Sequence, residues 1–241
     1  MGPGAAALLD IPAQAAARGI GQIEICHFHI PSTDAAYLGE LKASLAASNI
    51  QCLTLLIDEG DLTHPSPQAR QTDIETVRRW IAVAGELGAA RVRVIAGKSA
   101  PDASGDMLRL SAQHLHELAQ YAGDHGVRVV TENWFALLDR PAEVLHLLEA
   151  LDGEVGLLLD FGNWTGERKY ADLAQIARLA ESTHAKANYD ADGNLQTADY
   201  AHCLKICADA GFQGPHSLIF DSAGDEWTEI AKLRDFVLAA L

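Results

Sequence analysis

The stretch Val127–Asp160, which decides the fold, reads VRVVTENWFALLDRPAEVLHLLEALDGEVGLLLD. It begins and ends with short runs rich in Val and Leu, Val127–Glu132 and Val155–Asp160, as expected of strands buried on both faces. Between these runs, Pro141 suits the first turn of a helix over Pro141–Ala150. A strand, a helix and a second strand in this order are typical of a parallel sheet covered by helices.

The same alternation runs along the whole chain. Further strands are expected at Gln22–Cys26, Gln51–Ile57, Arg91–Ala96, Ser182–Lys186 and His216–Phe220. Further helices are expected at Ala5–Arg18, Asp34–Ala47, Gln71–Leu87, Asp106–His125, Ala171–Leu179, Ala198–Ala210 and Glu226–Leu241. Three glycines follow helical stretches and are expected as C-terminal caps, namely Gly88, Gly126 and Gly211. No linker or shift in composition divides the chain, so we interpret residues 1–241 as one domain.

An α/β barrel and an open doubly wound sheet both fit this alternation. No Gly-rich phosphate loop follows the first expected strand, which counts against a nucleotide-binding open sheet. Polar residues lie at the ends of many strands rather than at one switch point, which favours a TIM (β/α)8-type barrel. Only seven strands are read, because the chain opens with a helix and the first strand of a regular barrel is missing. We therefore expect either that residues upstream of Met1 supply this strand, or that the barrel has a seam between Gln22–Cys26 and His216–Phe220. A partner copy in a homo-oligomer is a candidate to cover such a seam.

The charge balance restricts the classes of partner. The chain has 18 Lys and Arg against 33 Asp and Glu, a formal net charge of −15. Such a surface repels phosphate backbones and anionic membranes, so we expect neither nucleic acid nor a membrane as a partner. No run reaches the ~18 apolar residues of a membrane helix, and Met1–Ala5 lacks the basic residues of a signal peptide. The 4 cysteines lack CxxC spacing and are expected as reduced, buried thiols of a cytoplasmic protein.

Three polar residues, Glu132, Asp160 and His184, lie at or near the ends of successive expected strands. The carboxyl ends of parallel strands meet on one face of the sheet, so these side chains are expected to converge. Two carboxylates and an imidazole at one point require a cation or a substrate there, and the ligand set allows Mn, Co, Zn or Mg. The structural alternatives are an ion pair of Glu132 with Arg93, a cap on the turn near Gly162 by Asp160, and a satisfied core histidine.

The last two strands add Lys186, Ile219 and Asp221. Lys186 lies two residues beyond His184 and so on the same strand face. It is expected either to contact a substrate oxygen or phosphate, or to pair with a barrel acid. The last strand has Ile219 where an acid would match the trio. Asp221, two residues further, is expected either to replace that acid through a water or to cap the following loop.

Aromatic and imidazole side chains are expected near the rim of the same barrel end. His27 and His29 follow the first strand at a two-residue spacing, and the alternatives are a substrate contact or an ordinary surface loop. The rings of Trp134, Phe28 and Trp164 suit stacking on the face of a sugar, with rim packing as the alternative. Of these residues, His27 and Trp134 are our candidates for substrate binding.

The chain resembles the xylose-isomerase-like barrels, a family of sugar and sugar-phosphate isomerases and epimerases that includes ketose 3-epimerases and inosose dehydratases. The resemblance rests on short motifs that occur in the family's order. They are Gly21–Ile25, Leu87–Ala89, Arg91–Val94, Thr131–Asn133, Leu159–Asn163, His184–Lys186, Ala198–Tyr200 and Gly211–Gly214. Each motif is unspecific alone, and the ordered set carries the resemblance.

The resemblance implies a divalent metal held by a Glu, an Asp, a His and a second Glu from four successive strands. Glu132, Asp160 and His184 match the first three places, and the fourth falls on Ile219. Asn163 stands where the family usually has a substrate-contacting His. The metal site implied for this chain is therefore degenerate, and metal binding is expected to be weak or absent.

By this resemblance, the chain is expected to be a metal-assisted isomerase, epimerase or dehydratase of a small sugar, polyol or sugar phosphate. Glu132 would remove the proton next to a carbonyl, and Lys186 or a water would return it. Ile219 favours an alternative, a non-catalytic or repurposed barrel that binds a carbohydrate or serves assembly. An apurinic-site nuclease shares the barrel but requires more His and acid ligands and a basic surface.

Overall fold

The computed structural model describes residues 6–240, so the expectations for Ala5 and Leu241 lie outside the described residues. The strands are β1 (Gln22–Cys26), β2 (Gln51–Leu56), β3 (Arg91–Arg93), β4 (Arg128–Glu132), β5 (Gly156–Asp160), β6 (Ala180–Lys186) and β7 (His216–Ile219). The α-helices are α1 (Ile11–Ala16), α2 (Ala35–Ala47), α3 (Pro67–Leu87), α4 (Asp106–Asp124), α5 (Pro141–Ala150), α6 (Lys169–Ile176), α7 (Thr197–Asp209) and α8 (Glu226–Ala240). Short 3₁₀ segments are η1 (Leu8–Asp10), η2 (His27–His29), η3 (Ala136–Leu138) and η4 (Ala177–Leu179).

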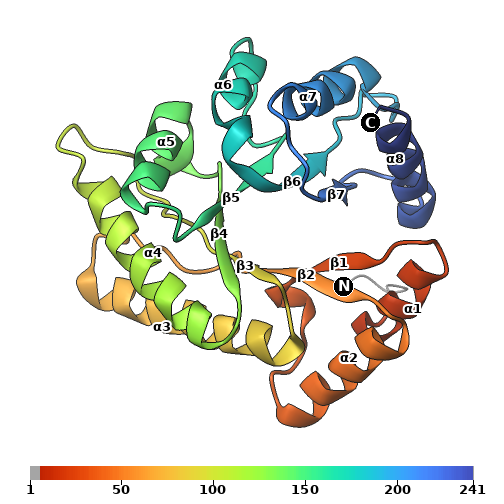
Figure 1. Cartoon of the computed structure of the whole chain (residues 1–241), viewed down its shortest axis with the longest axis horizontal. Coiled ribbons are helices and arrows are strands. Elements are labelled where there is room, and N and C mark those ends of the chain that lie inside the picture. The colour runs from red at the N-terminus through yellow and green to blue at the C-terminus, as the bar shows by residue number, and fades with distance from the viewer. Residues whose placement is uncertain (1–5, 241) are drawn as a thin grey trace.

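The 7 strands form one parallel sheet in the order β1 to β7, and the helices lie around its outside (Figure 1). Every neighbouring pair is parallel, from β1 with β2 through to β6 with β7. Within residues 6–240, no strand pairs with the outer edge of β1 or of β7. The prediction of a seven-stranded TIM-type barrel with a seam between its first and last strands is confirmed.

Side chains, rather than backbone hydrogen bonds, connect the two sides of this seam. Nε1 of Trp227 in α8 donates to Oε1 of Gln14 in α1 at 2.9 Å. The guanidinium carbon of Arg18 lies 4.3 Å from the centre of the Trp227 ring. Arg234 of α8 donates to the carbonyl of Arg18 at 2.9 Å. These contacts hold the last helix against the first one.

Local capping explains where the elements differ from the expected bounds. Helix α3 begins one turn earlier than expected, at Pro67, because Oγ of Ser66 accepts the N–H of Ala69 at 3.4 Å and proline needs no partner in the first turn. It ends at Leu87, and the C-cap is Gly88, whose φ of 70° is a conformation that glycine adopts without strain. The other two glycines expected as caps also have positive φ.

The barrel interior carries both apolar and charged side chains. Leu56, Val130 and Leu158 of β2, β4 and β5 form a small buried apolar cluster, and Arg93 of β3 lies on the same face, because it pairs with Leu56 and Val130. Residues paired across neighbouring parallel strands face the same side of the sheet. By this register the side near the seam carries four polar residues, namely Glu24, Thr54, Ser182 and Ser217. The larger apolar core lies between the sheet and the helices.

Candidate metal centre

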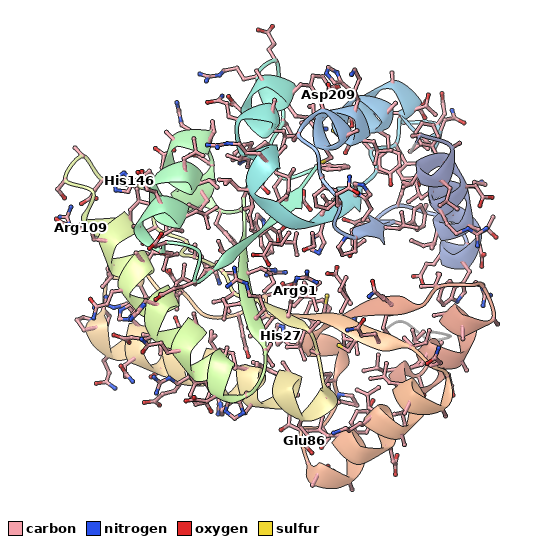
Figure 2. The ribbon with its side chains drawn as sticks, viewed as in Figure 1. His27, Glu86, Arg91, Arg109, His146 and Asp209 are labelled. Atoms are coloured by element: carbon pink, nitrogen blue, oxygen red, sulfur yellow. The ribbon has the colours of Figure 1, made fainter. Side chains whose placement is uncertain are left out.

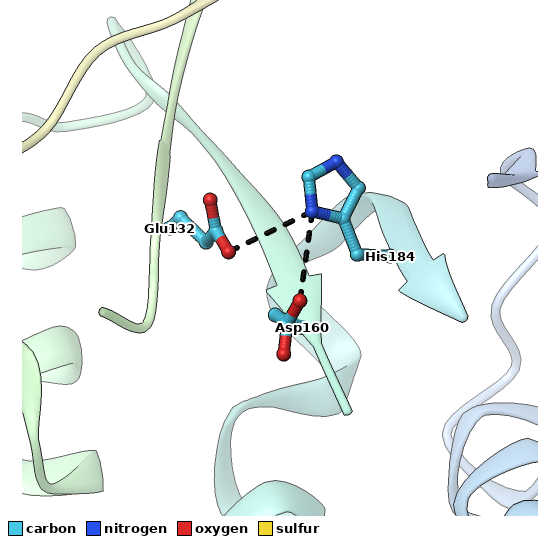
Figure 3. Close-up of side chains that lie close together, drawn as sticks. All are labelled: Glu132, Asp160 and His184. Carbon is cyan, nitrogen blue, oxygen red and sulfur yellow. Dashed lines mark ion pairs between the residues drawn. The ribbon is translucent and has the colours of Figure 1, made fainter. Parts of the chain in front are cut away.

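Glu132, Asp160 and His184 meet at the carboxyl ends of β4, β5 and β6 (Figure 3). Nδ1 of His184 lies 3.6 Å from Oε1 of Glu132 and 3.5 Å from Oδ2 of Asp160. Donor atoms held tetrahedrally at about 2.1 Å from one ion would be about 3.4 Å apart. All three side chains are buried. Their spacing therefore suits a single divalent cation.

The strand register produces this convergence. Asp160 pairs with His184 between β5 and β6, and Glu132 pairs with Leu158 between β4 and β5. The backbone of Glu132 is thus level with Leu158, two residues before Asp160 along the strand direction. The longer Glu side chain makes up part of that offset, which is why a Glu and an Asp can reach the same point.

Asp160 uses its two carboxylate oxygens differently. Oδ1 accepts the backbone N–H groups of Gly162 and Asn163 at 2.6 and 2.7 Å, so the expected cap on this turn is present. Oδ2 faces His184. The backbone of Asp160 is also held by Asn133, whose Oδ1 accepts its N–H at 2.7 Å and whose Nδ2 donates to its carbonyl at 3.1 Å. The cap and the place in the trio are therefore compatible.

Glu132 also divides its oxygens between two partners. Oε2 lies 3.0 Å from Nε of the buried Arg93, the ion pair expected as the structural alternative. Oε1 accepts a hydrogen bond from Nδ2 of Asn163 at 2.7 Å and faces His184. Burial opposes the charged form, but Arg93 and His184 outweigh it and lower the pKa of Glu132. The group is therefore a carboxylate at neutral pH, as a metal ligand must be.

The ring of His184 is surrounded by acceptors. Besides Glu132 and Asp160 on the side of Nδ1, Oε2 of Glu24 lies 3.0 Å from Nε2. Burial disfavours the imidazolium, but these three carboxylates raise the pKa of His184 well above its usual value. Sequence reasoning missed Glu24 as a site residue. A lone acid between two isoleucines in a short strand is a usable signal, because a buried Glu is rare without a partner.

Lys186 and Asp221 form an ion pair at the rim. Nζ of Lys186 lies 3.1 Å from Oδ2 of Asp221, whose side chain is 73% exposed. A Cβ at Gly162 would lie 2.9 Å from Cδ of Lys186, so the lysine stem passes directly over the turn that begins at Asp160. Among residues 6–240, the grouping of potential metal ligands contains the trio alone, without Asp221.

Ile219 faces the same side of the sheet as the trio. It pairs with Lys186 in the register between β6 and β7, while Ser217 pairs with His184. Ile219 is half-buried. An apolar side chain therefore stands where the family resemblance implied a fourth, acidic ligand.

His27 and Trp134 lie in different surroundings. The ring of His27 packs edge-on against Trp80 of α3, with centroids 5.2 Å apart, and its Nδ1 accepts the N–H of Asp58 at 3.2 Å. His27 is labelled among the side chains in Figure 2. Among residues 6–240, His27 is not part of the group of potential metal ligands. Trp134 stands next to the site, with its ring centre 5.0 Å from the guanidinium carbon of Arg93.

The backbone is strained just after Trp134. Phe135 has a φ of 57°, a region that bulky residues seldom adopt. The Phe135 ring lies 4.3 Å from the Trp134 ring, and Nζ of Lys98 lies 5.4 Å from its centre. Strain of this kind is common at the edges of functional sites, where packing holds a side chain in an unusual place.

A β/α barrel with two carboxylates and an imidazole at the carboxyl ends of successive strands defines a class of barrel proteins whose site could hold a metal ion. The sequence profile described as xylose isomerase-like TIM barrel matches residues 12–236. The chain therefore belongs to this family. No protein with a curated description matches the sequence.

Several solved structures share the fold. D-allulose 3-epimerase from Methylomonas sp. has a TM-score of 0.77 at 19% identity, with 97% of this chain and 92% of that chain covered. 3-Keto-D-glucoside 4-epimerase from E. coli has a TM-score of 0.75 at 14% identity, with 98% and 95% covered. A xylose isomerase-like barrel protein from Mycobacterium smegmatis, solved with magnesium, has a TM-score of 0.70 at 16% identity, with 98% and 89% covered. At these identities the similarity concerns the fold.

Proposed function

We propose that the protein is a metal-assisted isomerase or epimerase, or a dehydratase, of a small sugar, polyol or sugar phosphate. The observation that carries the proposal is the convergence of Oε1 of Glu132, Oδ2 of Asp160 and Nδ1 of His184. These donors suit Mn, Co, Zn or Mg, with the imidazole favouring a transition metal. Family membership and the sugar epimerases among similar folds support the substrate class.

A divalent ion bound by the trio would hold vicinal substrate oxygens and polarise a carbonyl. Glu132 is then the base that removes the proton next to that carbonyl, and its Oε1 faces the site. To take the proton, Oε1 must give up its hydrogen bond from Asn163, which frees a lone pair. Lys186, at the rim, or a water returns a proton. The remaining substrate contacts that we propose are Asn163, Trp134, His27 and Asp221.

The same site supports one alternative, a non-catalytic or repurposed barrel that binds a carbohydrate or serves assembly. Ile219 removes both a ligand and a second base, so metal affinity should be lower than in four-ligand relatives. Arg93 lowers the basicity of Glu132, and Asp221 engages Lys186. The missing acid at position 219 and these two ion pairs favour the alternative, because each removes or engages a group that catalysis would use.

An exchange assay separates the two functions. The protein is incubated in deuterated water with a panel of ketohexoses, ketopentoses, their phosphates and inososes, with added manganese or cobalt. An epimerase, isomerase or dehydratase should exchange one substrate C–H proton for deuterium. If manganese binds and no panel member exchanges, the non-catalytic barrel is the better description. If the protein neither binds manganese nor exchanges a proton of any panel member, the metal-assisted proposal is wrong.

Charge, helix hydropathy and the cysteines support a proposal for the partners and the compartment of the protein. The formal charge of −15 argues against nucleic acid. No helix among residues 6–240 has the combination of length and apolar character that crossing a bilayer requires. The four cysteines carry free thiols, which suits the reducing cytoplasm. We propose a cytoplasmic protein with one domain over residues 1–241 and a small-molecule substrate.

A further inference from the structure

The carboxylate of Glu24 lies behind the ring of His184. Oε2 of Glu24 is 3.0 Å from Nε2, whereas Nδ1 on the other edge of the ring faces Glu132 and Asp160. Both Glu24 and His184 are buried side chains, with 7% and 8% exposed. Because the two ring nitrogens point in different directions, Glu24 and the metal site occupy opposite edges of one imidazole.

Irregular strand pairing places Glu24 there. The register between β1 and β2 shifts between Ile23 and Glu24, so that Ile23 pairs with Cys52 but Glu24 pairs with Thr54. A second shift, between Leu157 and Leu158, precedes His184 in the pairing of β5 with β6. Such bulges commonly re-aim side chains beside functional sites. The pairing of β1 with β2 and of β5 with β6 is thus irregular just below the contact between Glu24 and His184.

The contact itself has a preferred direction. Oε2 of Glu24 and Nε2 of His184 are 3.0 Å apart, within hydrogen-bond distance. A carboxylate oxygen accepts hydrogen bonds, whereas an imidazole nitrogen that carries a hydrogen donates one. We therefore assign the N–H of Nε2 as the donor in this contact and Glu24 as the acceptor.

We infer that Glu24 is a positioning residue that fixes the His184 ring with Nε2–H toward β1 and Nδ1 toward Glu132 and Asp160, and thereby strengthens metal binding. The inference rests on the proposed metal-assisted function. A carboxylate that accepts the second N–H of a metal-bound histidine sets its tautomer, fixes its orientation and raises its basicity. The orientation of one ligand is a larger share of the total metal affinity in a site with three protein ligands than in a site with four.

Calorimetry with manganese tests the inference on the whole protein. Glu24→Gln keeps the shape and removes the charge, so it should weaken manganese binding by about 10–100-fold. Glu24 also crosses the seam, and a purely structural role must be separated from positioning. Trp227→Phe is the matched control, because it removes the hydrogen bond to Gln14 at the same seam without touching His184. It should lower the melting temperature and leave manganese affinity unchanged.

Equal affinity of wild type and Glu24→Gln within about twofold would overturn the role, as would an equal loss in the Trp227→Phe control. A second measurement does not depend on metal. In the wild type, NMR should show a slowly exchanging Nε2 proton on His184, and its signal should move upfield in Glu24→Gln, because a neutral acceptor forms a weaker hydrogen bond. If wild type binds no manganese, the proposed function fails, and this proton alone decides whether Glu24 orients the ring.

Discussion

Nε of Arg93 lies 3.0 Å from Oε2 of Glu132, and both side chains are buried. The same guanidinium pairs with Asp58 and donates to the carbonyl of Ile57 at 2.9 Å. Arg93 therefore links the ends of β2, β3 and β4 under the site. One oxygen of Glu132 is committed to this cation, which leaves the other for the trio.

Removing Arg93 should lower the free energy of unfolding, because the carboxylates of Asp58 and Glu132 both lose their partner. We expect Arg93→Met to destabilise the protein by about 3–5 kcal/mol, the usual effect of breaking a buried ion pair. The double variant Arg93→Met with Glu132→Gln should lose less stability than the sum of the losses in the two single variants. Urea unfolding of the two single variants and the double variant measures this coupling. Arg93→Lys, which keeps the charge but not the planar fork, should lose less. Strict additivity would mean that Arg93 and Glu132 do not interact.

Restoring an acid on β7 should complete the metal site. Ile219 faces the same side as Lys186 and His184, so Ile219→Glu adds a carboxylate there. We expect manganese affinity to rise at least about tenfold, equivalent to ~1.4 kcal/mol. Calorimetry on the variant and on Ile219→Gln, which has the same shape without the charge, separates ligation from bulk. Unchanged affinity in Ile219→Glu would show that position 219 does not reach the ion.

The trio and the seam could be predicted from the sequence because both depend on local patterns. Val127–Glu132 and its counterparts are short apolar runs that end in a polar residue, and parallel strands bring such ends together. The first residues of helices are harder to predict. A single side-chain hydrogen bond of Ser66 moves the start of α3 one turn ahead of the position that periodicity predicts. Periodicity locates an element, and capping contacts then set its ends.

The contacts that tune the site carry no such local signal. Glu24 and His184 are 160 residues apart in the chain and meet across a seam that no backbone pairing bridges. The position of His27 after a strand predicts a place at the barrel mouth, but the packing of its ring against Trp80 has no local sequence signal. Asn133, which clamps the backbone of Asp160, appeared only as part of a motif. Long-range partners such as these become visible only in three dimensions.

Acid should destabilise the protein partly through Asp199. Burial opposes its charge, but hydrogen bonds from Lys169 at 2.7 Å, Tyr170 at 2.8 Å and Asn188 at 2.9 Å lower the pKa of Asp199. A lowered folded pKa gives stability that is present above the ordinary value of about 3.9 and is lost as pH falls toward the folded value.

The urea midpoint of Asp199→Asn should therefore lie well below that of wild type at pH 7, and the two should approach each other below about pH 4. The exposed ion pair of Asp209 with Lys205 provides the control, because exposed pairs contribute little to stability. Asp209→Asn should follow wild type at every pH. A gap for Asp199→Asn that stays constant down to pH 3 would contradict the assigned cause.

The two edges at the seam should favour association. All four residues of β7 are only half-buried, whereas all five of β5 are buried. Unpaired strand edges tend to pair with another chain unless they are covered. We expect light scattering to detect a dimer or larger assembly whose population rises with concentration. Backbone amides of β1 and β7 should then exchange with deuterium more slowly at high concentration, while those of β3 and β4 stay unchanged. A monomer across the micromolar range would show that the edges need no partner.

If the proposed reaction occurs, Glu132 should be its principal base. Glu132→Gln keeps the shape and the hydrogen bond to Asn163 but cannot take a proton. Turnover of any substrate found in the panel should fall by a factor on the order of 10²–10⁴, the usual contribution of a positioned base. Exchange of the substrate C–H proton with deuterated water should fall in parallel, because both need the same abstraction. Asp221→Asn is the comparison. It should lower turnover less than Glu132→Gln does, because Asp221 contacts Lys186 at the rim and not the trio. Exchange that survives in Glu132→Gln while metal stays bound would assign the abstraction to another group.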